Sequence, residues 1–389
     1  MVKTARVPYN SRKGGLGMNH RERVNAIMHY ETYDRMPVVA FGYWRETLEK
    51  WRREGHITPE EAEGYSDNNE YDLAILRRLG FDFNWAGGVS GDSFLKPCFQ
   101  NETLYVEPDG CVVSRNSEGL IVRTKPGVVS IPSHVGTSLT GREAWEEMYL
   151  PKLTYSADRV RFDEMRARFS GIRAKGLPCY LEIGSLYGKV RNLVGVEELA
   201  YLAADDEELY KEIIDTVANL CFKVAERALE SGIEFDYAHY WEDICFKTGP
   251  LIRPSVFAEL VGPWYRKISD LLNAHGVDII SVDCDGKIDE LVPIWLENGV
   301  NTMFPIEVGT WGASFDRWRA AYGRGLRGVG GMDKRVFAQD RAAVDREIER
   351  LKPIVDLGGY IPCPDHRIPP DAVWENVQYY CDRFRHEFG

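Results

Sequence analysis

The stretch VDIISVDCDGKIDELVPIWLENGVNTMFPIE, residues 277–307, decides the fold that we expect for this chain. It holds two short apolar runs rich in β-branched residues, 277–283 and 300–305, separated by a segment with helical spacing at 287–297. Short apolar runs of this kind predict buried strands. A strand, a helix and a second strand in this order are typical of the βα units that surround a parallel sheet.

The same alternation continues in both directions from this stretch. Further strands are expected at 36–41, 81–87, 178–184, 234–240, 327–333 and 358–365, which gives eight in all. Helical spacing lies between them, as at 205–229 and 254–273. A closed (β/α)8 TIM barrel is the most economical arrangement of eight such units. An open doubly wound sheet is the alternative, but no expected strand runs into a GxGxxG turn.

One segment, 94–129, breaks the alternation between the second and third expected strands. Its residues alternate between apolar and polar, and the turn sequences EPDGC and RNSEG divide it. This pattern predicts an antiparallel β insertion, which would be either a lid or rim for the barrel or an ornament on it. We expect residues 18–389 to form a single barrel domain and residues 1–17 to be a flexible tail.

Composition excludes several classes of protein. The chain has 389 residues, and its 60 acidic residues outnumber its 48 basic ones, so a nucleic-acid partner is not expected. No apolar run approaches the ~18 residues that cross a membrane. The eight cysteines show no CxxC pair, and no secretion signal precedes them, which favours reduced thiols in the cytoplasm.

In such a barrel the chemistry is expected at the carboxyl ends of the strands. Polar residues follow five of the expected strands: His239, Glu242, Asp243, Asp283, Asp285, Glu307, Asp333, Asp365 and His366. Asp283 and Asp285 are two residues apart and can share a face. With His366 they predict a divalent metal site, for which zinc is the expected ion. The alternative is that Asp285 caps a helix and His366 satisfies a loop carbonyl.

Two further groups of residues are candidates for the site. The expected catalytic residues are Asp283, Asp285, Glu242 and His239. Three aromatic residues lie near strand ends: Trp44, Tyr187 and Trp241. They could line a pocket for a flat organic substrate or simply cover the core. Cys284, between the two aspartates, is expected to face away from them as a small buried residue.

Four stretches give the chain a family resemblance. They are RERVNAIMHYETYDRMPV (21–38), WEDICFKTGPLIRPSVFAELVGPWYRKI (241–268), VDCDGKIDELVPIWLENGVNTMFPIEV (282–308) and GGYIPCPDHRIPPDAVWENV (358–377). In this order they resemble the uroporphyrinogen decarboxylase superfamily, whose fold is a (β/α)8 barrel. The superfamily contains decarboxylases and corrinoid-dependent methyltransferases, so the site motifs must decide between the two branches.

The motifs resemble the methyltransferase branch more closely. True uroporphyrinogen decarboxylases carry an arginine-rich MRQAGR stretch after the first strand, whereas this chain has FGYWRETLEKW (41–51), and the late NLGHG-type segment is absent. The methyltransferases bind zinc through His-x-Cys-Gly at the fifth strand and a cysteine at the eighth. Here Asp283 and Asp285 stand in the places of that histidine and first cysteine, and His366 replaces the last cysteine.

The resemblance implies transfer of a methyl group between a small molecule and a cobalamin-type corrinoid carried on a partner protein. Oxygen and nitrogen ligands would make the metal a stronger Lewis acid than thiolates do, which suits an O- or N-methylated substrate. Demethylation of a methoxylated aromatic ring is the most attractive version of this reaction. A homodimer is compatible with the sequence. The alternatives are a metal-free decarboxylase or lyase that uses an aspartate as proton donor, and a barrel that binds a ligand without turnover.

Overall fold

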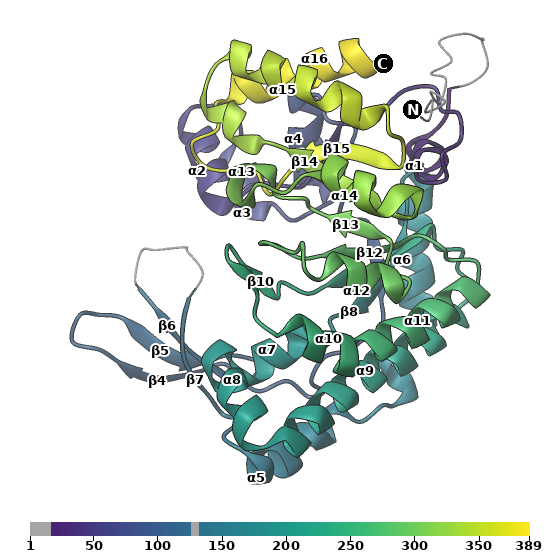
Figure 1. The fold of residues 1–389 in the computed structure, drawn as a ribbon. Coiled ribbons are helices and arrows are strands. Elements are labelled where there is room, and N and C mark those ends of the chain that lie inside the picture. The colour runs from purple at the N-terminus through teal and green to yellow at the C-terminus, as the bar shows by residue number, and fades with distance from the viewer. Residues whose placement is uncertain (1–16, 126–131) are drawn as a thin grey trace.

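The computed structural model describes residues 17–125 and 132–389 (Figure 1). Its centre is a parallel sheet of seven strands in the order β15-β14-β13-β12-β9-β8-β3. The bounds of these strands are β3 (Gly88–Ser90), β8 (Tyr180–Gly184), β9 (Tyr237–Trp241), β12 (Ile280–Asp283), β13 (Thr302–Phe304), β14 (Arg327–Met332) and β15 (Tyr360–Pro364). Each strand from β8 onward leads through one or more helices to the next, as parallel neighbours require.

Two short strands join the ends of this sheet. β1 (Val39–Ala40) pairs in parallel with β2 (Phe83–Asn84), and the chain continues from β2 into β3. On the other side, Tyr43 forms a parallel bridge with Ile368, just beyond β15. Because β2 and β3 share the second position, the strands occupy eight positions, and the fold is the predicted (β/α)8 barrel.

The helices cover the outside of the strands (Figure 1). They are α1 (His20–Met28), α2 (Arg45–Arg53), α3 (Pro59–Gly64), α4 (Glu70–Leu79), α5 (Arg142–Ala144), α6 (Phe162–Ala174), α7 (Gly188–Val194), α8 (Val196–Asp205), α9 (Glu207–Leu229), α10 (Pro254–Leu260), α11 (Gly262–Ala274), α12 (Val292–Glu297), α13 (Val308–Trp311), α14 (Phe315–Tyr322), α15 (Arg341–Val355) and α16 (Trp374–Phe388). Shorter turns are η1 (Trp145–Tyr149), η2 (Leu150–Leu153), η3 (Ala157–Arg159), η4 (Gly323–Gly325) and η5 (Lys334–Ala338). Within the described ranges, no helix is both long and apolar enough to cross a membrane.

The helix expected at 254–273 is in fact two helices, α10 and α11. The break falls at Val261, immediately before Gly262 and Pro263. Proline lacks the amide hydrogen that would continue the helix, but it fits the first turn of the next one. The apolar spacing persists across the break, which is why it predicted a single helix.

The insertion is an antiparallel sheet in the order β4-β5-β6-β7 that projects from one side of the barrel (Figure 1). Its strands are β4 (Glu102–Val106), β5 (Val112–Arg115), β6 (Leu120–Thr124) and β7 (Ser133–Thr137). The predicted insertion ended at residue 129, so β7 lies beyond it, and residues 126–131 are outside the described ranges. The predicted tail, 1–17, also lies outside them except for Gly17.

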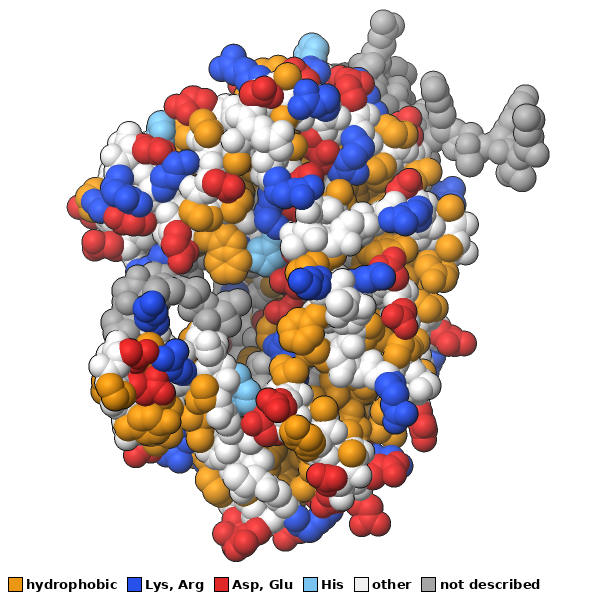
Figure 2. Space-filling model, turned by 60° about the vertical axis from the view of Figure 1, so that its left-hand side comes forward, with side chains coloured by type: hydrophobic (Ala, Val, Ile, Leu, Met, Phe, Trp, Pro, Cys, Tyr) orange, Lys and Arg blue, Asp and Glu red, His pale blue; other side chains and the backbone are white. Residues whose placement is uncertain are grey.

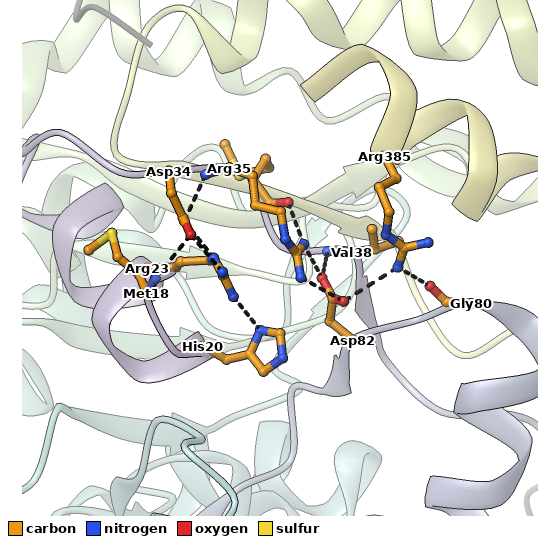
Figure 3. Close-up of polar contacts among 10 residues, drawn as sticks. Met18, His20, Arg23, Asp34, Arg35, Val38, Gly80, Asp82 and Arg385 are labelled. Atoms are coloured by element: carbon orange, nitrogen blue, oxygen red, sulfur yellow. Dashed lines mark hydrogen bonds and ion pairs between the residues drawn. The ribbon is translucent and has the colours of Figure 1, made fainter. Parts of the chain in front are cut away.

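A network of ion pairs ties the chain ends together at the amino-terminal side of the barrel (Figure 3). Asp82, just before β2, accepts hydrogen bonds from Arg35 at 2.6 and 3.0 Å and from Arg385 of α16 at 3.4 Å. Beside it, Arg23 of α1 donates to Asp34 at 2.6 and 2.7 Å. The first two strands are thus held to the first and last helices, at the end of the barrel opposite to the carboxyl ends of the strands.

Candidate active site

Three aspartates meet where β9 and β12 end. Asp243 follows β9, Asp283 is the last residue of β12, and Asp285 follows it; one carboxylate oxygen from each lies within 4.8 Å of the others. The two strands are neighbours in parallel register, with Trp241 opposite Asp283, and this pairing brings residues forty positions apart together. The insertion projects on the side to which the strands point, and Figure 2 shows that side hollowed between the insertion and the barrel.

The backbone beyond each strand turns sharply to form this cluster. Asp243 adopts a left-handed conformation with φ of +51°, and Gly286 has φ of +86°. A β-carbon on Gly286 would lie 2.5 Å from the carbonyl oxygen of Cys245, so only glycine fits. The turn lets the Asp285 amide donate a hydrogen bond to Asp243 Oδ1 at 3.2 Å. Cys284 is buried and accepts from the Ile244 amide.

His366 reaches the cluster from the loop after β15. Its Nε2 lies 3.1 Å from Asp285 Oδ2. Its ring stacks on Trp44 with 5.2 Å between centroids, and Phe41 packs edge-on against it at 5.5 Å. The structure therefore joins His366 to Asp285 at the edge of the three-aspartate cluster, which contains Asp243 as well as the expected Asp283 and Asp285.

The charges in this cluster are unbalanced. Burial raises the pKa of Asp283 well above its usual range, and Asp285 and Asp243 add to the shift. Burial and the neighbouring Asp285 raise the pKa of Asp243 to about 6. Asp285 Oδ1 is buried without a hydrogen-bond partner. Unpaired buried carboxylates of this kind need a cation or a proton. Three carboxylates and one imidazole are a donor set that fits a divalent metal such as zinc.

A second ionic group lies beside the cluster, at the ends of β13, β14 and β15. Glu307 Oε2 accepts from the Gly286 amide at 2.9 Å, and Oε1 is 4.0 Å from Lys334 Nζ. Lys334 Nζ is also 3.4 Å from the fully buried Asp365, which accepts from the Gly309 amide at 2.6 Å. Burial and the charge of Asp285 raise the pKa of Glu307 to about 7. Lys334 was not among the residues expected from sequence.

The inner face of β8 and β9 completes the site. His239 is hydrogen bonded through Nδ1 to Ser281 at 3.2 Å, and burial lowers its pKa to about 4. Tyr180 lies against it, with ring centroids 5.0 Å apart, and Glu182 stands opposite it on β8. Glu182 was missed from sequence, although the alternation in PCYLEIG (178–184) places Tyr180 and Glu182 on one face of the strand.

Three other expected site residues make different contacts. Glu242 is fully buried and accepts hydrogen bonds from five donors: the amides of Leu186, Tyr187 and Gly188 and the hydroxyls of Ser185 and Tyr265. Tyr187 is buried among the outer helices, and its hydroxyl bonds that of Tyr210 at 2.8 Å. Trp241 is only partly buried, and Arg191 lies over its ring at 5.4 Å.

Asp333, the other acidic residue expected at a strand end, pairs with Arg335. Arg335 Nε and Nη2 donate to its two carboxylate oxygens at 2.9 and 2.8 Å. Its carboxylate is therefore engaged within its own turn, outside the three-aspartate cluster.

The fold and these strand-end residues define a (β/α)8 barrel with a candidate metal centre at its mouth. The uroporphyrinogen decarboxylase (URO-D) family model matches residues 189–387, just over half of the chain. The chain belongs to this enzyme family. No protein of curated function matches the sequence.

Comparison with solved structures finds the following similarities. A methyltransferase from Methanosarcina mazei is 17% identical, with a TM-score of 0.58, and the match covers 95% of this chain and 99% of that one. A protein from Listeria monocytogenes described as a vitamin-B12-independent methionine synthase is 13% identical, with a TM-score of 0.40, over 90% of this chain and 96% of that one. At 17% identity, the likeness to the Methanosarcina structure is one of fold.

Proposed function

We propose that this protein transfers a methyl group from a small O- or N-methylated compound to a corrinoid carried by a partner protein, with the help of a divalent metal. Asp243, Asp283, Asp285 and His366 would hold the metal, with zinc the expected ion. The observation that carries the proposal is the unbalanced cluster of three carboxylates beside an imidazole at the barrel mouth. The methyltransferase name of the Methanosarcina structure is consistent with it.

A metal bound by these residues would supply Lewis acidity to an oxygen or nitrogen of the substrate. The chain itself positions the ligands. Trp44 and Phe41 fix the His366 ring by stacking and edge contact, and the Gly286 turn directs Asp285 toward Asp243. Positioning of this kind keeps ligands in place before the metal arrives.

Glu307 is the proposed proton donor for the departing group. Its Oε2 is fixed by the Gly286 amide, and Oε1 accepts no hydrogen bond from any described residue and lies toward Lys334. Burial is the larger cause of the raised pKa of this carboxyl, and it favours the protonated form that general acid catalysis requires.

The mouth does not suit uroporphyrinogen, which carries many carboxylates. Arg45, the first basic residue after β1, is exposed, and the ammonium group of Lys50 already donates to the Ala372 carbonyl at 2.7 Å. The aspartates and Glu307 would repel an anionic tetrapyrrole. A neutral or cationic small molecule fits this charge better.

Metal analysis tests the proposal. Purified protein incubated with zinc and then desalted should hold close to one zinc per chain. His366→Ala should lose most of it, while His386→Ala, an exposed histidine on α16, should keep it. The double variant Asp285→Ala with His366→Ala should lose methyl transfer to a corrinoid protein. Zinc-free protein, or transfer that survives in the double variant, would contradict the proposal.

A metal-free decarboxylase or lyase is the second candidate. The observation that favours it is Asp283, whose raised pKa equips it as a proton donor when no metal is bound. Turnover of a carboxylic acid that is unaffected by chelators and lost in Asp283→Asn would establish this function instead.

A further inference from the structure

Three neighbouring side chains on the inner wall of the barrel leave hydrogen-bonding atoms unused. They are Tyr180 and Glu182 of β8 and His239 of β9. Across the described ranges, no residue hydrogen bonds to the Tyr180 hydroxyl, the Glu182 carboxylate or His239 Nε2, and His239 bonds only through Nδ1. None of these atoms is sealed away from solvent, so all three groups are free to bind a ligand that enters the barrel.

These side chains point into the barrel. The His239 ring lies 5.8 Å from that of Phe304 on β13, and since β12 separates the two strands, this contact crosses the interior. Tyr180 contacts His239, and Glu182 is two residues further along the same face of β8. Leu181 and Ile183, on the opposite face, are buried under the helices. The group therefore lies on the inner wall next to Asp283.

Among the residues that the structure describes, none forms an ion pair with Glu182. The nearest cations act on it only at a distance: Lys189 pairs with Glu118 at 3.1 Å and Arg168 is exposed. Burial raises the pKa of the Glu182 carboxyl. A divalent metal would offset only two of the three aspartate charges beside it, so the mouth stays negative when the metal is bound. A half-buried, unpaired carboxylate in such a field favours a cation.

We infer that Glu182, with Tyr180 and His239, binds a protonated amine of the substrate, a cationic nitrogen that bears at least one N–H. The Glu182 carboxylate pairs with the positive charge, and the phenol ring of Tyr180 offers an aromatic contact to the cation. Nε2 of the neutral His239 imidazole can accept a hydrogen bond from the N–H. This inference rests on the proposed function in taking the barrel mouth as the substrate site. It makes Glu182 a specificity residue for methylated amines and amino alcohols over methoxylated arenes.

Paired ligands that differ only in charge test the inference. N,N-dimethylethanolamine is protonated at pH 7, and 3-methyl-1-butanol is its neutral isostere, with CH in place of NH⁺. Titration calorimetry of the zinc-incubated protein should show about tenfold tighter binding of the amine, the effect of one charge-assisted hydrogen bond. Glu182→Gln should reduce this preference to about twofold or less. Glu143→Gln, which neutralises an exposed glutamate on α5, should leave it unchanged.

Two further measurements make the outcome unambiguous. Glu182→Asp keeps the charge and should keep part of the preference, which separates loss of charge from misfolding. Zinc content measured on the same samples should be unchanged in Glu182→Gln. Equal binding of the two ligands, no binding of either, or a preference that survives Glu182→Gln would overturn the inference. If the wild-type protein itself does not bind zinc, the proposed function is overturned instead.

Discussion

At the scale of single residues, His239 combines a buried imidazole with one hydrogen bond, to the hydroxyl of Ser281. In the folded protein its pKa is about 4, whereas an imidazole in the unfolded chain titrates near 6.5. Between these values the unfolded state binds more protons than the folded state. Stability must therefore fall as the pH is lowered through this window, and the imidazole is neutral at pH 7.

We expect His239→Gln to remove this acid sensitivity. The wild-type protein should lose about 3 kcal/mol of unfolding free energy between pH 6.5 and 4 through this one group, and the variant should not. Urea unfolding at several pH values measures the difference between the two proteins. His386→Gln, on the surface of α16, should follow the wild type; a wild-type pH profile in His239→Gln would contradict the buried neutral imidazole.

Glu242 illustrates a different use of a buried carboxylate at a strand end. Its five hydrogen bonds hold the first turn of α7 and the hydroxyl of Tyr265 in α11, which makes it a positioning residue in this structure. Glu242→Gln should lower the free energy of unfolding by about 2 kcal/mol or more, because the side-chain NH2 group of glutamine would face backbone N–H donors. Glu259→Gln, on the exposed side of α10, serves as control. Unchanged stability with lost turnover would assign Glu242 to catalysis.

At the scale of elements, the turn after β12 depends on glycine for two separate reasons. Gly286 has a left-handed backbone, and a β-carbon at this position would lie 2.5 Å from the carbonyl oxygen of Cys245. Gly276, between α11 and β12, has φ of +79° but open space around it. Comparing alanine at the two positions separates backbone strain from the steric clash.

Gly276→Ala should lower the unfolding free energy by about 1 kcal/mol, the strain of a left-handed alanine. Gly286→Ala should lower it by about 2 kcal/mol more, because the β-carbon displaces the Cys245 carbonyl, and it should also weaken zinc binding through Asp285. Denaturant unfolding and zinc titration measure both effects. Equal losses at the two positions would contradict the close approach.

The elements of the barrel could be predicted well because apolar runs and helical spacing are local patterns. Six of the eight expected strands contain one barrel strand each. Of the other two, 234–240 ends one residue before the end of β9, and 81–87 contains β2 but not β3. The convergence of strand ends at one side of a barrel led us to expect Asp283, Asp285 and His366 near one another, and His366 contacts Asp285. Asp243 was seen near the rim but not chosen, since its left-handed backbone cannot be read from sequence. Tyr187, expected near a strand end, lies in the helical layer, where its hydroxyl bonds that of Tyr210.

At the scale of the whole molecule, the ionic network at the amino-terminal end is separate from the site. Arg35→Ala should leave the Asp82 carboxylate, which is 9% exposed, without its main partner and should lower stability by about 2 kcal/mol. Zinc content should not change, because the site lies at the opposite end of the strands. Arg52→Ala, which removes an exposed ion pair with Glu49 on α2, should have no measurable effect. Zinc loss in Arg35→Ala would show that the two ends are coupled.

The order of the site residues along the chain divides the barrel into two halves. The four proposed metal ligands all come from the strands β9 to β15, within the part that the family model matches, whereas Trp44, Tyr180 and Glu182 come from the part before it. On the proposed assignment, the later half carries the reaction, while Tyr180 and Glu182 of the earlier half choose, together with His239, the molecule that undergoes it. A new substrate preference could then evolve, or be engineered, by exchanging β8 while the strands that carry the metal ligands are left intact.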